Sequence, residues 1–265
     1  DADKQNNEFL KDRQIHMNLY AIQGMLARVY WMKGDLKTAA EYAQKILDCK
    51  YFELVDKSEI EDLINGVLSP KETIWGLFSA NFYTNVRADL YLSGGSSSLF
   101  LKADHDDTYM ADKEGTDYRY EKWFKNYSAI EASGMRCIKV LDTYELNYAT
   151  RSDARVKGVN MLRLPELYYI ITEYYLSIDN QTEAVKYFDK VLVSRGLTGY
   201  ADRQGATLTL EKVIQERRKE LVCEGQYFFT QKRYNQNIYE PKSGKIYQAS
   251  NDIYVLPLPE NETEY

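Results

Sequence analysis

The sequence predicts a mainly α protein in which helical hairpins flank a large, irregular, loop-rich insertion containing short strands. Apolar residues recur at helical spacing in residues 8–50 and again in residues 161–235, which predicts helical packing in both regions. Residues 51–160 lose this period and carry aromatic side chains among Gly, Ser and Asp. Residues 236–265 are predicted as an extended tail, because two prolines near its end force an extended course. We therefore predict one domain over residues 1–265, incomplete at its N-terminus.

The first hairpin consists of two predicted helices, over residues 8–33 and 36–49, separated by Gly34-Asp35. The packing stripe expected on the first helix steps by four, three, four and three residues and comprises Ile15, Leu19, Ile22, Leu26 and Val29. The second helix is rich in alanine, and small side chains let two helices approach closely. Leu26, Ala27, Tyr30, Gly34, Ala39 and Ala43 match a tetratricopeptide unit.

The second hairpin is predicted over residues 162–195. Pro165 suits the first turn of a helix, and Asp179-Asn180 makes the turn between the two helices. The two hairpins are about 145 residues apart, whereas tandem tetratricopeptide units repeat about every 34 residues. The sequence therefore predicts a helical scaffold with a large insertion rather than a regular repeat array.

A charged amphipathic helix follows over residues 210–224, and Gly225 permits a left-handed stop after it. Glu216 and Glu220 lie one turn apart on the same face, and Glu216 can also pair with Lys219. Such regular pairing is typical of helix packing. We interpret Glu216, Arg217 and Glu220 as structural residues that tie the helical hairpins together.

The insertion is where we expect ligand binding. Residues 72–79 alternate and predict a short strand, and residues 94–98, Gly-Gly-Ser-Ser-Ser, predict a flexible loop. Long loops with aromatic residues on a rigid scaffold usually carry binding sites. The alternative is that half or more of these aromatic residues only pin the loops to the scaffold. The candidate ligand-binding residues are Tyr83, Arg87, Tyr91, Tyr109, Tyr118 and Trp123.

Composition and motifs argue against several classes of function. The net charge is −6 and no long block of Lys and Arg occurs, which disfavours nucleic-acid binding. No apolar run reaches the roughly 18 residues that a membrane span needs. The sequence contains no GxSxG, Walker or GxGxxG motif, so no enzymatic activity is predicted. A pair of carboxylates for glycoside hydrolysis cannot be chosen among 40 acidic residues.

No metal site, cofactor or disulfide framework is predicted. Cys49, Cys137 and Cys223 are far apart and odd in number, and with two histidines they are too few for a zinc site at any usual spacing. Residues 104–107, Asp-His-Asp-Asp, lack the glycine of an EF-hand loop. We interpret this segment as a solvated acidic loop.

Four segments give the chain a resemblance to the SusD/RagB family. Arg163 and Glu166 fall on charged positions of a family motif, and weaker similarities occur at Asp117, Arg119 and Lys139. Two family positions after Gly225 that commonly hold Arg and Asp are occupied here by Tyr227 and Thr230, while Arg233 matches a later basic position. The four segments are LYAIQGMLARVYWMKGDLKTAAEYAQKIL at 19–47, LRLPELYYIITEYY at 162–175, ERRKELVCEG at 216–225 and VLPLPENE at 255–262.

The resemblance implies a SusD-like α-α superhelix and a role in binding without chemistry. The expected function is capture of an oligosaccharide at the bacterial outer-membrane surface and its delivery to a TonB-dependent SusC-like transporter, without a cofactor. The resemblance also implies a lipoprotein whose only membrane contact is an N-terminal lipid anchor outside this chain, which looks like the C-terminal half of such a protein. Aromatic loops fit this role, because aromatic rings stack on sugar faces while neighbouring polar groups bond the hydroxyls.

Two other functions compete with oligosaccharide capture. The first is capture of an oligopeptide in the same type of complex. The second is a tetratricopeptide-type protein-interaction module without a small ligand, which burial of the aromatic residues between 82 and 123 would favour. In the family-based interpretation, the helical hairpins form the wall that meets the transporter, and Arg163 and Glu166 are structural.

Overall fold

The structure, a computed structural model, describes residues 12–60, 63, 66–79, 109, 115–129, 132–137, 139, 156–240 and 243–257. It divides the chain into two compact units, Asp1–Glu224 and Gly225–Tyr265. The first unit contains both predicted hairpins and the charged helix. The boundary between the two units lies before the short helix that follows Gly225, and thus earlier than the predicted start of the tail at residue 236.

The first hairpin is built from α1 (Leu19–Lys33) and α2 (Leu36–Asp48). Helix α1 begins later than predicted because the side chain of Asn18 accepts hydrogen bonds from the N–H groups of Tyr20 and Ala21. A single 3₁₀ turn, η3 (Arg13–Ile15), lies before it. Gly34 ends α1 with a φ of 83°, in the left-handed region that glycine adopts without steric cost.

The packing face predicted for α1 is wrong. Leu19, Ile22 and Val29 are 62%, 47% and 48% exposed. The buried face of α1 instead comprises Ala21, Gly24, Ala27 and Trp31. A Cβ atom on Gly24 would lie 2.1 Å from Cδ2 of Leu162, so the missing side chain at this position makes room for Leu162.

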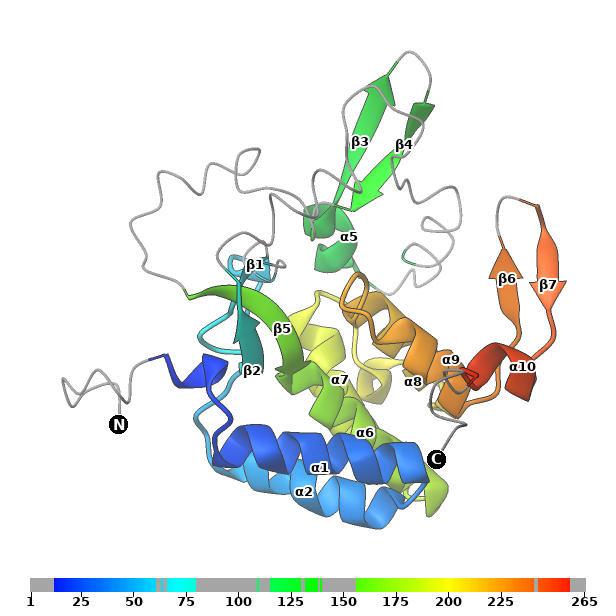
Figure 1. The fold of residues 1–265 in the computed structure, drawn as a ribbon. Helices are drawn as coiled ribbons and strands as arrows, with labels where there is room; N and C mark the ends of the chain where they lie inside the picture. The colour runs from blue at the N-terminus through cyan, green and yellow to red at the C-terminus, as the bar shows by residue number, and fades with distance from the viewer. Residues whose placement is uncertain are drawn as a thin grey trace, which may run out of the picture. The chain divides into compact units, whose positions relative to one another are not determined.

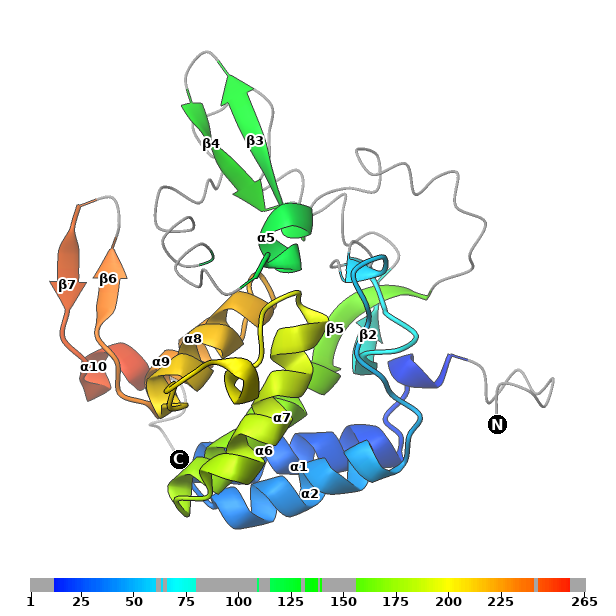
Figure 2. The ribbon, with the colours of Figure 1, turned by 180° about the vertical axis from the view of Figure 1, so that it is seen from behind.

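The second hairpin is built from α6 (Leu164–Ser177) and α7 (Gln181–Ser194), as predicted. Pro165 occupies the first turn of α6, and the side chain of Asn180 accepts a hydrogen bond from the N–H of Glu183 at the start of α7. Helix α6 packs against α2 and α1, so the two hairpins lie side by side although the insertion separates them in sequence (Figures 1 and 2).

Strands join the insertion to this scaffold. The predicted strand is β2 (Thr73–Phe78), and it pairs antiparallel with β5 (Lys157–Arg163), which also pairs with β1 (Gly66–Val67). Strand β5 was not predicted and leads directly into α6. Farther along the insertion, the short helix α5 (Tyr118–Trp123) runs into a hairpin formed by β3 (Phe124–Ala129) and β4 (Ala132–Cys137).

The charged helix is α8 (Leu210–Glu220), which ends four residues earlier than predicted. A 3₁₀ turn, η7 (Tyr200–Asp202), lies between α7 and α8. Thr209 caps α8 by accepting a hydrogen bond from the N–H of Lys212, and Gly225 has the expected positive φ of 71°.

The second unit is more regular than the predicted extended tail. It contains α9 (Tyr227–Arg233), the antiparallel strands β6 (Ile238–Glu240) and β7 (Lys245–Tyr247), and the short helix α10 (Asn251–Tyr254). Gly244, with a φ of 70°, forms the turn between the strands. The last residues of the predicted tail, 258–265, lie outside the described ranges.

Charged residues from many elements meet in the interior of the first unit, in what we name the central ion cluster. Glu220 accepts hydrogen bonds from Arg195 and Arg163 at 2.9 Å and lies 3.4 Å from Arg119. Five carboxylates and five cations make up the cluster: Glu72, Asp117, Glu216, Glu220 and Glu224 with Arg119, Lys139, Arg163, Arg195 and Lys219.

The charges of the central ion cluster compensate one another. Burial acts to raise the pKa of Glu220, but Arg195 and Arg163 outweigh it and hold this pKa well below its usual range. Glu72 is equally buried and accepts hydrogen bonds from Arg163, Arg195 and the N–H of Val55. Glu220 therefore stays ionised because guanidinium groups replace the water it has lost.

A second, smaller group of charges links the two hairpins, and we name it the Glu166 cluster. Glu166 on α6 accepts hydrogen bonds from Arg28 on α1 at 2.6 and 2.9 Å and from Arg217 on α8 at 2.7 Å. Arg217 also lies over the ring of Trp31, 4.3 Å from its centroid, and Trp31 donates a hydrogen bond to Glu173. Three helices that are distant in sequence are thus fixed by one carboxylate.

Replacing Glu220 by Gln should lower the free energy of unfolding by about 3–5 kcal/mol, because it leaves buried arginines without their compensating charge. The matched control is Glu41→Gln on α2, where the carboxylate lies 4.0 Å from Lys37 and both side chains are exposed. That change should cost about 1 kcal/mol or less. Denaturation curves in urea measure both values. Equal losses for the two variants would contradict a stabilising role of the central ion cluster.

The Glu166 cluster should make stability depend on acid pH. Burial acts to raise the pKa of Glu166, but Arg28 and Arg217 outweigh it and lower the pKa to about 2, from 4.5. Because the folded-state pKa lies below the unfolded value, the stabilisation is complete above about pH 4.5 and is lost as the pH falls towards 2. Melting temperatures of the wild type and Glu166→Gln should therefore differ most near pH 6 and converge towards pH 2. A difference in melting temperature that stays constant between pH 6 and pH 2 would contradict this prediction.

Candidate functional site

The six predicted ligand-binding residues do not form one described site. Tyr83, Arg87 and Tyr91 lie outside the described residues. Trp123 is 0% exposed, and its indole Nε1 donates a hydrogen bond to the carbonyl of Ile60 at 3.0 Å. Trp123 is thus a core residue, and its buried ring offers no surface to a ligand in this conformation.

Tyr109 is also buried, and its hydroxyl donates a hydrogen bond to the carbonyl of Lys219 at 2.8 Å. Burial raises the pKa of Tyr109 well above its usual value, so the hydroxyl remains a donor. For Tyr109 and Trp123, burial in the core replaces the predicted exposure to ligand. Both rings belong to one apolar cluster, together with Val55, Ile60, Leu63, Phe124 and Cys137, which we name the insertion core.

Tyr118 differs from these two residues because it is only half-buried. Its ring packs on the edge of the insertion core, and Nζ of Lys57 lies 4.7 Å from the ring centroid. Asp117 and Arg119, on either side of it, belong to the central ion cluster, and Asp117 caps α5 through the N–H of Arg119. Its neighbours therefore fix the backbone of Tyr118 while part of its side chain stays accessible.

The residues predicted to be structural are brought together. Arg163, Glu216 and Glu220 lie in the central ion cluster, and Glu166 and Arg217 lie in the Glu166 cluster. Sequence reasoning missed Glu72 and Arg195. Arg195 donates hydrogen bonds to Glu72, 123 positions away in the chain, and to Glu220, 25 positions away. Their local sequence resembles any charged strand or helix end, so pattern alone offers no signal for them.

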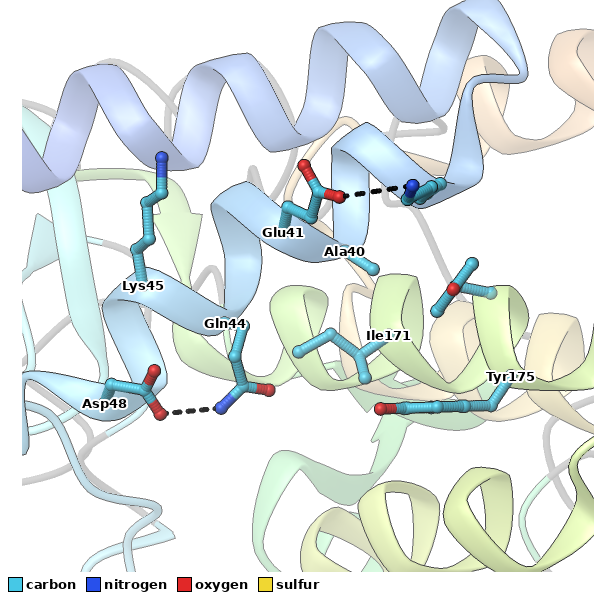
Figure 3. Close-up of a pocket in the computed structure, with 9 residues that line it drawn as sticks. Ala40, Glu41, Gln44, Lys45, Asp48, Ile171 and Tyr175 are labelled. Carbon is cyan, nitrogen blue, oxygen red and sulfur yellow. Dashed lines mark hydrogen bonds and ion pairs between the residues drawn. The ribbon is translucent and has the colours of Figure 1, made fainter.

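A pocket of about 440 Å³ lies between α2 and α6 (Figure 3). Ala40 and Ile171 are buried and provide apolar surface. Charged and amide side chains of α2 line one side, and tyrosines of α6 line the other. The lining residues are Lys37, Ala40, Glu41, Gln44, Lys45, Asp48, Ile171, Tyr174 and Tyr175.

The tyrosine side of this pocket is held in place by stacking and hydrogen bonds. The ring of Tyr175 stacks on Tyr187 of α7, with centroids 5.6 Å apart and planes inclined by 16°. The hydroxyl of Tyr187 donates a hydrogen bond to Oε1 of Gln44 at 2.9 Å, and Gln44 donates to Asp48 at 2.7 Å. Burial raises the pKa of Tyr187, which keeps this donor protonated.

The α2/α6 pocket can hold a polar group of a ligand or partner against apolar surface, with both signs of charge close by. None of the described candidate residues, Tyr109, Tyr118 and Trp123, lines it. The sequence predicted the second hairpin, to which Tyr175 belongs, but not a pocket beside it. The charged residues of α2 look like an ordinary solvated face, and the pocket arises only when α6 packs beside them.

No group of three or more His, Cys, Asp or Glu residues is arranged to hold a metal ion in the part of the chain that the structure describes. The acidic segment 104–107 lies outside that part. Within the described ranges, no helix combines the length and hydrophobicity that a membrane-spanning segment requires.

Solved structures share this fold. A SusD-like carbohydrate binding protein from Bacteroides vulgatus matches with a TM-score of 0.72 at 17% identity, over 96% of this chain and 59% of that chain. A SusD superfamily protein from Bacteroides thetaiotaomicron matches with a TM-score of 0.70 at 22% identity, over 93% of this chain and 58% of that chain. A putative sugar binding protein from Bacteroides vulgatus matches with a TM-score of 0.68 at 21% identity, over 93% of this chain and 57% of that chain. The chain thus spans less than two thirds of the length of each structure.

A comparison with curated proteins gave no match. The mainly helical architecture agrees with that of the SusD-like structures. The family model described as SusD family matches residues 49–264, which is well over half of the 265 residues. The chain therefore belongs to the SusD family.

Proposed function

We propose that this protein captures an oligosaccharide at the surface of the bacterial outer membrane and delivers it to a SusC-like TonB-dependent transporter, without catalysing a reaction. The observation that carries this proposal is the SusD family match over residues 49–264. SusD family proteins are binding proteins, and the structural neighbour with a TM-score of 0.72 is described as carbohydrate binding. The family also implies an outer-membrane surface lipoprotein, consistent with this role.

The glycan is proposed to contact the aromatic residues of the insertion that the core does not bury. Tyr118 is half-buried and stands on backbone that the central ion cluster fixes. A tyrosine in such a position can stack on a sugar face while its hydroxyl bonds to water or to the ligand. Tyr83, Arg87 and Tyr91 remain predicted contacts. Tyr109 and Trp123 would instead support the site as buried residues of the insertion core.

The transporter is proposed to contact the helical hairpins at the α2/α6 pocket. In both ribbon views, α2 lies at the bottom of the first unit, and α5 lies above the helices at the foot of the β3–β4 hairpin (Figures 1 and 2). Separate surfaces would let the protein hold a glycan and a transporter at the same time. The pocket combines apolar surface, tyrosine rings and a charged rim, which is the usual composition of a protein interface.

One observation favours the second candidate function, a protein-interaction module without a small ligand. Two of the three predicted contacts that the structure describes, Tyr109 and Trp123, are buried, as this alternative expects. The half-buried Tyr118 is the residue that separates the two functions. Capture of an oligopeptide in the same type of complex is distinguished by the ligand that co-purifies with the protein.

Replacing Tyr118 by Ala in the intact protein should weaken binding of its glycan by about 3- to 10-fold, because one aromatic stacking contact is lost. Calorimetry across a broad panel of oligosaccharides identifies the glycan and then measures the variant. The control is Tyr239→Ala, an exposed tyrosine of the second unit, which should leave affinity unchanged. If the intact protein binds no glycan of the panel and instead co-purifies with peptides, the proposal gives way to oligopeptide capture.

Changing Tyr174 to Ala together with Lys45 to Glu should weaken the complex with the SusC-like transporter at least tenfold, since both residues line the α2/α6 pocket. Co-purification from outer membranes, followed by measurement of the dissociation constant, gives the result. The control Lys190→Glu reverses an exposed charge on α7 away from the pocket lining and should have no effect. An unchanged dissociation constant for the double variant would remove the pocket from the interface.

A further inference from the structure

Two cysteines that are distant in sequence lie next to each other in the first unit. Cys137 ends β4, and Cys223 follows α8, 86 positions farther along the chain. Their Sγ atoms are 3.6 Å apart. The spacing of the three cysteines in the sequence predicted no disulfide framework, and the fold brings two of them together.

Other contacts hold the same two segments against each other. Lys139 lies two residues after Cys137, and its Nζ donates a hydrogen bond to the carbonyl of Glu220 at 2.9 Å and forms an ion pair with Glu224. Val222 packs against the insertion core, to which Cys137 belongs. Contacts in the central ion cluster and in the insertion core therefore hold the two sulfur atoms close to each other.

The two thiols differ in accessibility and acidity. Cys137 is buried, whereas Cys223 is exposed and has a positive φ of 62° in the turn after α8. The hydrogen bond with Cys137 lowers the pKa of Cys223, and the nearby charge of Lys139 acts in the same direction. Cys223 is thus the thiol that a reagent in solvent can reach and the one that ionises more readily.

We propose that Cys137 and Cys223 are a site of disulfide formation, and that the bond forms on reaction with an external disulfide outside the cytoplasm. A disulfide needs its sulfur atoms about 2.05 Å apart, so the two thiols must approach by about 1.5 Å. Small side-chain rotations at the end of β4 and in the turn can supply this movement. That the protein meets an oxidising environment rests on the proposed function at the cell surface.

The reaction proceeds by two thiol–disulfide exchanges. The Cys223 thiolate attacks one sulfur of the external disulfide, forms a mixed disulfide and releases the other sulfur as a thiolate, which takes up a proton. The thiolate of Cys137 then attacks Sγ of Cys223 and releases the second thiol. The two cysteines lose two electrons and two protons in total, and the external disulfide gains them as two thiols.

The bond would close a loop that runs from the later part of the insertion through the second hairpin and α8. It would join the end of β4 to the turn after α8, beside the ion pair of Lys139 and Glu224. A crosslink between residues 86 positions apart restricts the unfolded chain strongly. The scaffold depends on buried charges, and acid weakens its ion pairs. The covalent bond would then still hold the end of β4 against the turn after α8.

The test treats the purified, reduced intact protein with oxidised glutathione and then blocks remaining thiols. Intact-mass measurement should show the loss of two hydrogen atoms and one blocking group, on Cys49, with no added glutathione. Peptide mapping without reductant should join the Cys137 and Cys223 peptides. Oxidation should raise the melting temperature by about 5 °C or more, reversed by dithiothreitol. Cys49→Ser is the matched control and should react as the wild type does.

Cys223→Ser should leave the fold intact and abolish both the mass change and the rise in melting temperature. Two results would overturn the proposal: all cysteines remaining as thiols after treatment, or Cys137 and Cys223 carrying glutathione without becoming joined. Neither depends on glycan binding. Failure of the disulfide is thus distinguishable from failure of the proposed function, which calorimetry measures on the same protein.

Discussion

The ionised carboxylate of Glu220 sets the geometry of the first unit. It has lost contact with water and depends on Arg119, Arg163 and Arg195 for compensation. These arginines belong to α5, to the end of β5 and to the segment after α7. Each guanidinium has fixed hydrogen-bond directions, so one carboxylate specifies where three remote segments must lie. A misplaced element would leave a buried charge without a partner, which packing alone cannot repair.

The same constraint explains how a large insertion coexists with a rigid scaffold. Glu72, before β2, and Arg163, at the end of β5, bind each other and thereby fix the antiparallel pair at the two ends of the insertion. Asp117 and Arg119 fix α5 within it. The central ion cluster thus fixes both ends of the insertion and one helix within it. The proposed capture of a glycan would use this arrangement, because binding loops need a rigid support.

The sequence predicted the helices, turns and strand β2 better than it predicted how these elements pack together. The turns at Asp179-Asn180 and at Gly34 and the strand at residues 73–78 depend on local chemistry and were found. The buried face of α1 was mistaken because it combines Trp31 with small residues such as Ala27, whereas larger aliphatic side chains lie on the exposed side. The α2/α6 pocket was missed for a different reason: it exists only after two helices with ordinary surfaces are packed together.

The segment ERRKELVCEG at 216–225 shows why a motif can be specific without being a ligand site. Glu216, Glu220 and Glu224 belong to the central ion cluster, so their identities are set by charges elsewhere in the fold. Cys223 precedes Glu224, whose ion pair with Lys139 lies beside the contact between the sulfur atoms of Cys223 and Cys137. The ion pairs and the apolar packing of the insertion core together hold the thiols close, and a disulfide would fix this contact covalently.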